Sequence, residues 1–395
     1  MTEPPTPPSP PTPPATTAAQ LKGLSREKLD LLIRKLRGEP GAKAATGIAR
    51  KRGEGPLPLS AAQQRLWFLD QLEPGSPAYN VAGGARLLGA LDAAALSRAL
   101  DEVVRRHEAL RTTFAVQGSQ PVQVVGQPFR VSLPVLDLRS LSAAERTAEV
   151  HRRLAADALR PFDLARGPLL RTALLAVAAE EHVLLVNMHH IVSDGWSMGI
   201  FLRDLGALYG AFKEGKPSPL PELPVQYPDY AQWQREQPAS VLDGQLAFWR
   251  EQLQGVPTLL DLPADHPPAV LGSPPAGFLE ATLPADLQRD IAELGRRENL
   301  TPFMVLLAAF GALLARRSGQ LDLLIGSPIA NRRRTEIEGL IGFFVNTLVL
   351  RVDVAGAGSA GSDGGSESGA ESGRGLLERV RRTTIGAFDH QDTPF

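Results

Sequence analysis

The sequence contains no cysteine among its 395 residues. Disulfide scaffolds, zinc sites built on thiolates and a cysteine nucleophile are therefore excluded, and a reducing compartment is expected. No apolar run reaches the length that spans a membrane, and the N-terminus lacks the basic start and apolar core of a signal peptide. We therefore expect a cytoplasmic protein that does not interact with a membrane.

An excess of charge of either sign is also missing. Lysine and arginine number 42 and aspartate and glutamate 43, so the formal net charge is −1, and no nucleic acid partner is expected. The 43% of hydrophobic and 22% of charged residues are typical of an ordinary globular protein, and the length is sufficient for at least two domains.

Proline and glycine are plentiful, with 34 and 37 residues, but they are concentrated in a few segments. Residues 1–20 form a proline-rich stretch, which predicts a disordered tail. Residues 21–55 hold four apolar residues at helical spacing and then a Gly-rich basic stretch, which predicts a short amphipathic helix and a linker, a possible docking segment. Residues 355–375 are rich in glycine and serine and predict a flexible insertion.

The remaining sequence alternates between helical and extended patterns, which predicts a mixed α/β fold of the two-layer α+β kind. Helices are expected at residues 60–72, 91–107, 142–158, 197–213, 285–298, 301–317 and 376–389. Strands are expected at residues 79–88, 111–117, 171–177, 182–189, 321–326 and 343–353.

The densest cluster of chemically capable residues is MHHIVSDGWS, at residues 188–197. His189 and His190 are two of only seven histidines, and they end an apolar strand directly before a glycine turn. Because successive strand residues point to opposite faces, one histidine can face a cleft while the other packs inward. A histidine in such a place suits proton transfer or stabilisation of a charged intermediate, although two ordinary structural histidines would give the same pattern.

Two other interpretations of this cluster compete. His189, His190 and Asp194 are metal-ligating residue types, but adjacent strand histidines diverge, and we predict no metal site. Ser197 stands in a G-x-S-x-G sequence between a strand and a helix, as in the nucleophile elbow of a hydrolase. The downstream histidines that could complete a triad, His266 and His390, both lie in loop-like stretches.

Other segments are ordinary when taken singly. RHEALRT at residues 106–112 is typical of a solvated or salt-bridged helix end. The basic run at residues 331–334 is typical of the protein surface, and Trp233, in an aromatic stretch, is typical of packing.

Taken together and in order, these segments resemble the condensation domain of nonribosomal peptide synthetases. The resemblance covers residues 56–395, and its first and third motifs look most like the subtype that accepts an L-configured donor. It is carried by LSAAQQRLWFLDQL, RHEALRTTF, MHHIVSDGWS, YPDYAQW, IGFFVNTLVLR and HQDTPF.

The resemblance implies two lobes of chloramphenicol-acetyltransferase fold, at residues 56–215 and 216–395, which form a V with a central tunnel. It implies that the α-amine of an acceptor aminoacyl group attacks a donor thioester, which gives a peptide bond. Both substrates would be carried on the phosphopantetheine arms of carrier domains, and no cofactor would be bound directly.

The resemblance also implies roles for individual residues. His190 would face the tunnel as a base or a positioning group, and Gly195 would offer its N–H to the oxyanion. His189 and Asp194 would be structural. Asp194 would form an ion pair with one of two arginines, Arg106 or Arg111, and Asn346 would line the tunnel from the second lobe.

The family usually continues beyond HQDTPF, so the second lobe is expected to be truncated in a chain that ends at Phe395. An upstream donor carrier domain on a separate polypeptide and downstream acceptor carrier and adenylation domains are the expected partners. A non-catalytic, carrier-recruiting module of the same fold is the main alternative function, and a serine hydrolase that uses Ser197 is another.

Overall fold

The computed structural model describes residues 47–50, 57–263, 279–355 and 373–394. The chain divides into two compact units, Met1–Ala49 and Arg50–Phe395, and the second contains every element described below. The predicted proline-rich tail, the predicted N-terminal helix and nearly all of the predicted Gly/Ser-rich insertion lie outside the described residues. Among the described helices, no single one is long and apolar enough to cross a membrane, and one pair meets that test only together, across a bend of 103°.

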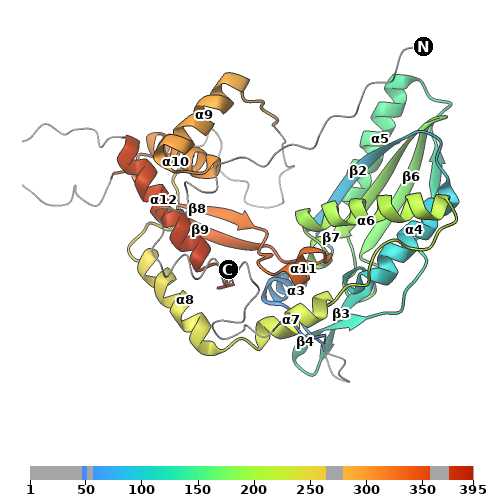
Figure 1. Ribbon diagram of the computed structural model, residues 1–395, viewed down its shortest axis with the longest axis horizontal. Helices are drawn as coiled ribbons and strands as arrows, with labels where there is room; N and C mark the ends of the chain where they lie inside the picture. Colours follow the sequence, from blue (N-terminus) through green and yellow to red (C-terminus); the bar gives the residue numbers. More distant parts are fainter. Residues whose placement is uncertain (1–46, 51–56, 264–278, 356–372, 395) are drawn as a thin grey trace, which may run out of the picture. The chain divides into compact units, whose positions relative to one another are not determined.

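The fold is mixed α/β, as the sequence patterns predict (Figure 1). In the first part of the unit the elements are β1 (Leu57–Pro58), α3 (Ala61–Leu72), β2 (Asn80–Leu88), α4 (Ala93–Arg106), the 3₁₀ turn η2 (Glu108–Arg111), β3 (Thr112–Gln117), β4 (Gln120–Val125), β5 (Val135–Asp137), α5 (Ala143–Ala158), β6 (Leu170–Ala178), β7 (Glu181–His189), the 3₁₀ turn η3 (His190–Val192) and α6 (Gly195–Lys213). In the second part they are α7 (Tyr227–Arg235), α8 (Ala239–Gln252), α9 (Ala285–Glu298), α10 (Pro302–Ser318), β8 (Asp322–Ile329), α11 (Thr335–Glu338), β9 (Asn346–Asp353) and α12 (Gly373–Asp389).

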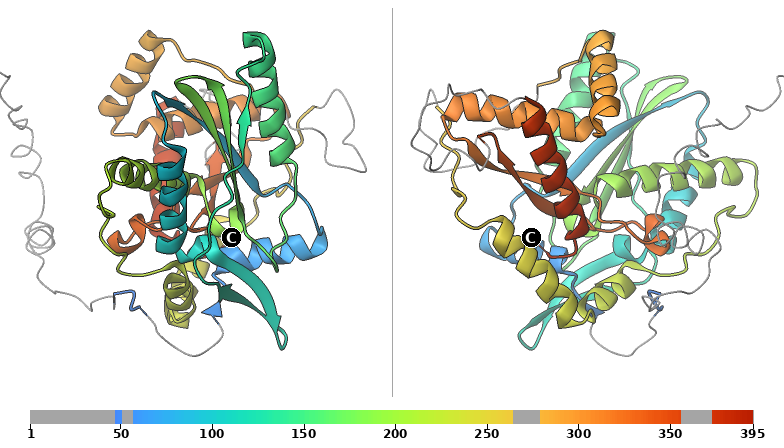
Figure 2. Two further views of the ribbon diagram at one scale, coloured as in Figure 1. Left: turned by 90° about the vertical axis from the view of Figure 1, so that its right-hand side faces the viewer. Right: turned by 60° about the vertical axis from the view of Figure 1, so that its left-hand side comes forward.

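A four-stranded sheet with the order β2-β7-β6-β5 is the centre of the first part. Strand β7 is buried along seven consecutive residues because helices cover both faces of the sheet. Its even-numbered residues, Leu184, Val186 and Met188, pack with α4 and α6, while Val183 and Leu185 pack on the side of α5. Figure 2 (left) shows α5 on one side of this sheet and α4 with α6 on the other.

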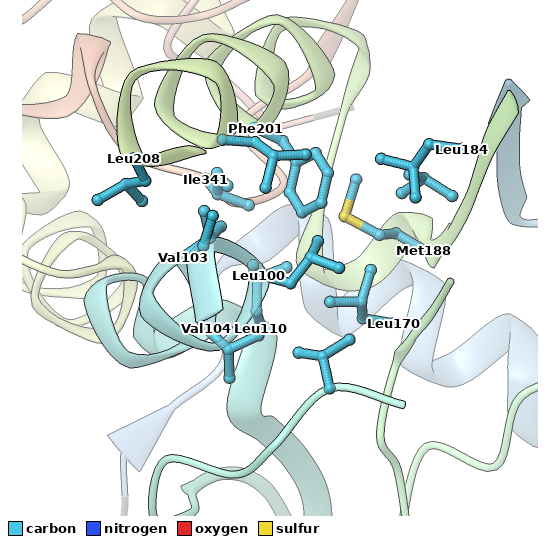
Figure 3. Close-up of a cluster of buried hydrophobic side chains, with 14 of the residues drawn as sticks. Leu100, Val103, Val104, Leu110, Leu170, Leu184, Met188, Phe201, Leu208 and Ile341 are labelled. Carbon is cyan, nitrogen blue, oxygen red and sulfur yellow. The ribbon is translucent and has the colours of Figure 1, made fainter. Parts of the chain in front are cut away.

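The main core lies between this sheet and the pair α4–α6, and Figure 3 shows its side chains converging from all of these elements. Leu100 and Val103 of α4 and Phe201 of α6 are fully buried there. Ile341, from a loop far along the chain, inserts into the same cluster. The N-terminal end of α6 is therefore fixed by a well-packed core.

The second part is built on the antiparallel pair β8–β9, which is covered by α10 and α12. Leu348, Leu350 and Val352 alternate along β9 and pack against these helices, and Figure 2 (right) shows α12 running along the strands. The alternation along β9 is the pattern expected of a strand with one buried face.

Some elements were not predicted from the sequence. Strands β4 and β5 are short, and α8 lies in a region without a clear helical pattern. Helix α7 has no predicted counterpart, although Pro228 at its first turn is a common helix-start signal. Strands β1, β4 and β3 form a separate three-stranded sheet.

Candidate active site

His189 ends strand β7 and is buried, with only 2% of its surface exposed. Its Nδ1 accepts a hydrogen bond of 3.1 Å from the Ile191 N–H. Burial, with a smaller contribution from the neighbouring His190, lowers the pKa of His189 to about 4. His189 is therefore a neutral side chain at pH 7, bonded to its own turn.

His190 opens the turn η3 and is only partly buried. Its Nδ1 lies 2.7 Å from the Ser193 carbonyl oxygen. Because a carbonyl can only accept, Nδ1 must carry a proton, and the neutral imidazole then has its lone pair on Nε2. The ring of Phe343 meets the His190 ring edge-on at 4.7 Å. The imidazole is thus held with one nitrogen, Nε2, available for a substrate.

Asp194 caps the N-terminus of α6 and is fully buried. Its Oδ1 accepts from the Ser197 N–H at 2.8 Å, and its Oδ2 accepts from the Phe344 N–H at 3.1 Å. Nη2 of Arg332 lies 3.1 Å from Oδ1. One carboxylate therefore joins the start of α6 to two segments more than 130 residues away in the sequence.

Arg332 is the cation that balances this carboxylate, and its side chain is 2% exposed. Its Nη1 donates to the carbonyl oxygens of Ile337 at 2.8 Å and Leu340 at 2.7 Å, and its guanidinium lies 4.1 Å from the centroid of the Phe344 ring. The prediction that the basic run is a surface feature is wrong for Arg332. Sequence reasoning missed it because nothing in the run of arginines distinguishes the buried one.

The predicted ion pair between Asp194 and Arg106 or Arg111 is wrong. Arg106 reaches α6 but pairs at 3.2 Å with Asp204, which is ten residues, or about 15 Å of helix, beyond Asp194. Arg111 lies 3.5 Å from Glu108 on its own turn and donates to the Gly126 carbonyl. Both arginines make their contacts at or just after the C-terminal end of α4, as expected of a salt-bridged helix end.

Asp204 is the centre of a second buried network on α6. It accepts from Arg106, from Nε2 of His107 at 3.0 Å and from Arg203 at 2.8 Å. Nδ1 of His107 in turn accepts from the Ile341 N–H at 3.3 Å. Burial lowers the pKa of His107 despite the opposing effect of Asp204.

Ser197 does not have the environment of a hydrolase nucleophile. It is fully buried, and its Oγ lies 2.7 Å from Asp194 Oδ1, 2.9 Å from the Gly342 carbonyl oxygen and 3.0 Å from Arg332 Nη2. It also accepts from the Gly342 N–H at 3.1 Å. None of these partners is a histidine, so the G-x-S-x-G sequence is here the first turn of a capped helix.

Gly195 is the first residue of α6 and is exposed. A Cβ built on it would meet nothing within 4 Å. Its N–H is one of the first four of the helix, which have no partner inside the helix and carry a partial positive charge. Gly195 therefore has open space on the side where a Cβ would lie, and its N–H is a group that attracts negative charge.

Asn346 and Trp233 lie in the second part. Asn346 is 8% exposed and donates to the carbonyl oxygens of Gln391 at 3.0 Å and Thr393 at 2.8 Å, so it holds the HQDTPF segment; its place in a tunnel wall stays a prediction. Trp233 packs against Tyr230 and lies under the guanidinium of Arg334.

The arrangement supplies a proton acceptor, His190 Nε2, beside the N-terminus of a 19-residue helix whose capping carboxylate is neutralised by Arg332. In the residues the structure describes, no group of three or more His, Asp or Glu side chains could hold a metal ion. The chemistry that these side chains can perform is acceptance of one proton and stabilisation of a developing negative charge.

Comparison with known proteins gives a consistent result. The family model of the condensation domain matches residues 53–395. A linear gramicidin synthase of Brevibacillus parabrevis is 48% identical over 343 residues, and chondramide synthase cmdD of Chondromyces crocatus is 48% identical over 340 residues. These matches cover 87% and 86% of the chain but only 6% and 8% of the relatives, so the chain spans less than a tenth of their length.

Solved structures are similar as well. The X-domain from teicoplanin biosynthesis is 30% identical with a TM-score of 0.76, and the match covers 88% of this chain and 74% of that one. The first condensation domain of the calcium-dependent antibiotic synthetase has a TM-score of 0.71 and 23% identity, over 86% of this chain and 76% of that one. The second likeness concerns the fold alone.

Proposed function

This chain belongs to the condensation-domain family, and from that premise we propose that it joins an acceptor aminoacyl group to a donor acyl thioester through His190. Condensation domains of peptide synthetases catalyse peptide-bond formation, and their fold is that of chloramphenicol acetyltransferase. The proposal concerns which residues of this chain perform the reaction and on which substrates.

The observation that supports the proposal most is the hydrogen bond from His190 Nδ1 to the Ser193 carbonyl. It assigns the proton to Nδ1 and leaves Nε2 as an acceptor for an N–H of the acceptor amine. A substrate amine beside Nε2 would be oriented for attack, or deprotonated as it attacks, and both roles stay open.

In the proposed reaction the amine nitrogen forms a bond to the thioester carbon, and the carbon–sulfur bond then breaks. The nitrogen loses one proton and the leaving thiolate gains one, so the reaction needs no other reactant. An α-amine has a pKa near 8, so a useful fraction is already neutral at pH 7. Most of the catalysis would then come from bringing the two substrates together, which can contribute several kcal/mol.

The N-terminus of α6 is the proposed site for the negative charge that develops on the thioester oxygen. Gly195 has open space beside it, and the N–H groups of the first turn point out of a long helix. Because Arg332 neutralises Asp194, the capping carboxylate would not repel that oxygen.

We further propose that donor and acceptor are presented on phosphopantetheine arms of carrier domains, as the peptide-synthetase relatives suggest. A donor with an L-configured residue, a donor carrier on a separate polypeptide, downstream acceptor carrier and adenylation domains, and a cytoplasmic location belong to the same proposal. The relatives are far longer than this chain, which fits a module that works beside others.

The test is to mix the 395-residue chain with carrier proteins loaded with a panel of L-aminoacyl donors and aminoacyl acceptors. Mass spectrometry of the acceptor carrier should detect the dipeptidyl thioester. His190→Ala should lower its rate of formation by about 100-fold or more, since general acid–base groups contribute that much. His151→Ala, on the exposed face of α5, is the matched control and should leave the rate unchanged. Equal rates for wild type and His190→Ala would rule out the proposed role.

A recruiting module of the same fold is the second candidate, because the teicoplanin X-domain has been solved in complex with OxyB. A recruiting module would bind loaded carriers but would form no product with any donor and acceptor of the panel. The ordered imidazole of His190 favours catalysis over recruitment.

A further inference from the structure

The loop at residues 341–344 is held by side chains from elsewhere in the sequence. The N–H of Ile341 donates to His107, and that of Phe344 donates to Asp194. The N–H of Gly342 donates to Ser197 Oγ, which also lies 2.9 Å from the Gly342 carbonyl oxygen. The path of the loop is therefore fixed by hydrogen bonds to its backbone.

The remaining bond to this loop comes from Tyr227, the first residue of α7, which donates its hydroxyl proton to the Phe343 carbonyl oxygen. The Tyr227 oxygen also lies 2.8 Å from Ser60 Oγ. Because the tyrosine proton is used at Phe343, Ser60 must be the donor in this second bond. Ser60 itself accepts from the Gln63 N–H at the start of α3.

The ring of Tyr227 packs directly against the loop. A Cβ on Gly342 would lie 2.0 Å from Tyr227 Cδ2, so only glycine allows the ring this close. The Phe344 ring meets Tyr227 edge-on at 4.9 Å. Tyr227 is 1% exposed, and burial raises its pKa well above the ordinary value, so the hydroxyl stays protonated and remains a donor.

Phe343 is the residue of this loop that faces the candidate active site. It is 2% exposed, and its ring lies edge-on to His190, 4.7 Å between centroids at an interplanar angle of 63°. Within the described part of the chain the His190 imidazole has one hydrogen bond, to the Ser193 carbonyl, so the ring can rock about that bond. The Phe343 ring limits this movement on one side.

We propose that Tyr227 is a positioning residue for His190 and acts through Phe343. Its hydroxyl fixes the Phe343 carbonyl, the fixed backbone aims the Phe343 ring, and the ring keeps His190 Nε2 directed at the substrate. The inference rests on the proposed function of His190. It also makes a claim that can be tested without turnover, namely that Tyr227 and Phe343 restrict the movement of the His190 imidazole.

The central variant is Tyr227→Phe, which removes only the hydroxyl. Tyr230→Phe is the matched control, because Tyr230 is a buried tyrosine of the same helix whose ring also packs against Phe344, but whose hydroxyl accepts from Gln234 rather than bonding to the loop backbone. In the carrier assay, Tyr227→Phe should lower kcat about tenfold with little change in KM, since small misplacements of a catalytic group are costly. Tyr230→Phe should leave both unchanged.

A double-mutant cycle tests whether Tyr227 acts through Phe343. Phe343→Leu keeps an apolar side chain and all backbone bonds of the loop but removes the ring edge beside His190. If the inference is correct, Tyr227→Phe combined with Phe343→Leu is no slower than the slower single variant. Multiplicative losses would overturn it.

Nitrogen NMR of the full chain with ¹⁵N-labelled histidine supplies a readout that needs no turnover. The His190 signals, assigned by their loss in His190→Gln, should show the Nδ1–H tautomer in the wild type. They should move toward an average of both tautomers in Tyr227→Phe and Phe343→Leu, and not in Tyr230→Phe. Unchanged signals in Phe343→Leu would overturn the inference even if Tyr227→Phe does not fold, whereas full activity of His190→Ala would overturn only the proposed function.

Discussion

Helix α6 contains two fully buried aspartates, each paired with an arginine, that do different things. Asp194 caps the helix and binds Arg332 and the 341–344 loop, so it joins distant segments beside His190. Asp204, in the middle of the helix, binds Arg106 at the end of α4 and reaches the 341–344 loop only indirectly, through His107 and the Ile341 N–H. A buried ion pair therefore does not by itself indicate a functional site. The two ion pairs differ in the segments of the chain that they hold in place.

The largest effect is expected from Asp194→Asn. It leaves Arg332 buried without a counter-charge and replaces one of the two acceptor oxygens by an amide donor, which should cost about 3–5 kcal/mol of unfolding free energy. Urea unfolding should show this loss. At temperatures where the variant is folded, product formation in the carrier assay should still fall strongly, because the N-terminus of α6 and the 341–344 loop shift together.

A smaller effect, on stability alone, is expected from Asp204→Asn. The neutral amide can still accept from His107 and Arg106, so a loss of about 2–3 kcal/mol is expected from the weaker charge-assisted bonds. Urea unfolding measures the loss, and the kcat of the folded variant should stay within about twofold of wild type. A strong loss of kcat would show that Asp204, like Asp194, is needed for activity.

The pH dependence of stability should reflect the buried histidine next to the Asp194 turn. The folded-state pKa of His189 is lowered from 6.5 to about 4, so its contribution is complete above pH 6.5 and is lost as the pH falls toward 4. From these two values the loss is about 2 kcal/mol at pH 5.

His189→Asn keeps an acceptor for the Ile191 N–H but cannot be protonated, so it should flatten the slope of unfolding free energy against pH in that window. The exposed His151→Asn is the control and should keep the wild-type slope. A slope that is unchanged in His189→Asn would mean that another group takes up the proton.

The smallest effect on stability is expected from Gly195→Ala. The added Cβ meets nothing within 4 Å, and alanine in a helix is not disfavoured, so unfolding free energy should change by less than about 1 kcal/mol. If the thioester oxygen approaches this N–H, the rate in the carrier assay should nevertheless fall. If the variant has the wild-type rate, Gly195 does not take part in the proposed site, and the role of Asp194 is purely structural.

Much of the fold could be predicted because local patterns dominate its central elements. The apolar run of β7, the capped start of α3 at Ser60 and the Thr301–Pro302 start of α10 are local signals, and the helices and strands there match. Helix α7 is not among the predicted helices, although Pro228 is such a signal, because it is short and its buried residues follow one another without a clear helical spacing.

The candidate site was only partly predictable for a different reason. The histidine pair and Asp194 are adjacent in the sequence, so they could be found together. The partner of Asp194 is 138 residues away, among several arginines, and only the folded chain shows which guanidinium reaches it. Tyr227 and Phe343 were noticed as parts of motifs, but their contact with each other depends on Gly342, whose missing side chain leaves no periodic signal.

The 341–344 loop has one more consequence, for protein engineering. Its route is set by hydrogen bonds to N–H and C=O groups, which every amino acid except proline provides. The identity of residue 343 can therefore be varied without rerouting the loop, while position 342 must remain glycine because the Tyr227 ring fills the space beside it. A library of side chains at position 343 would therefore place different groups beside the His190 imidazole while the backbone of the loop stays the same.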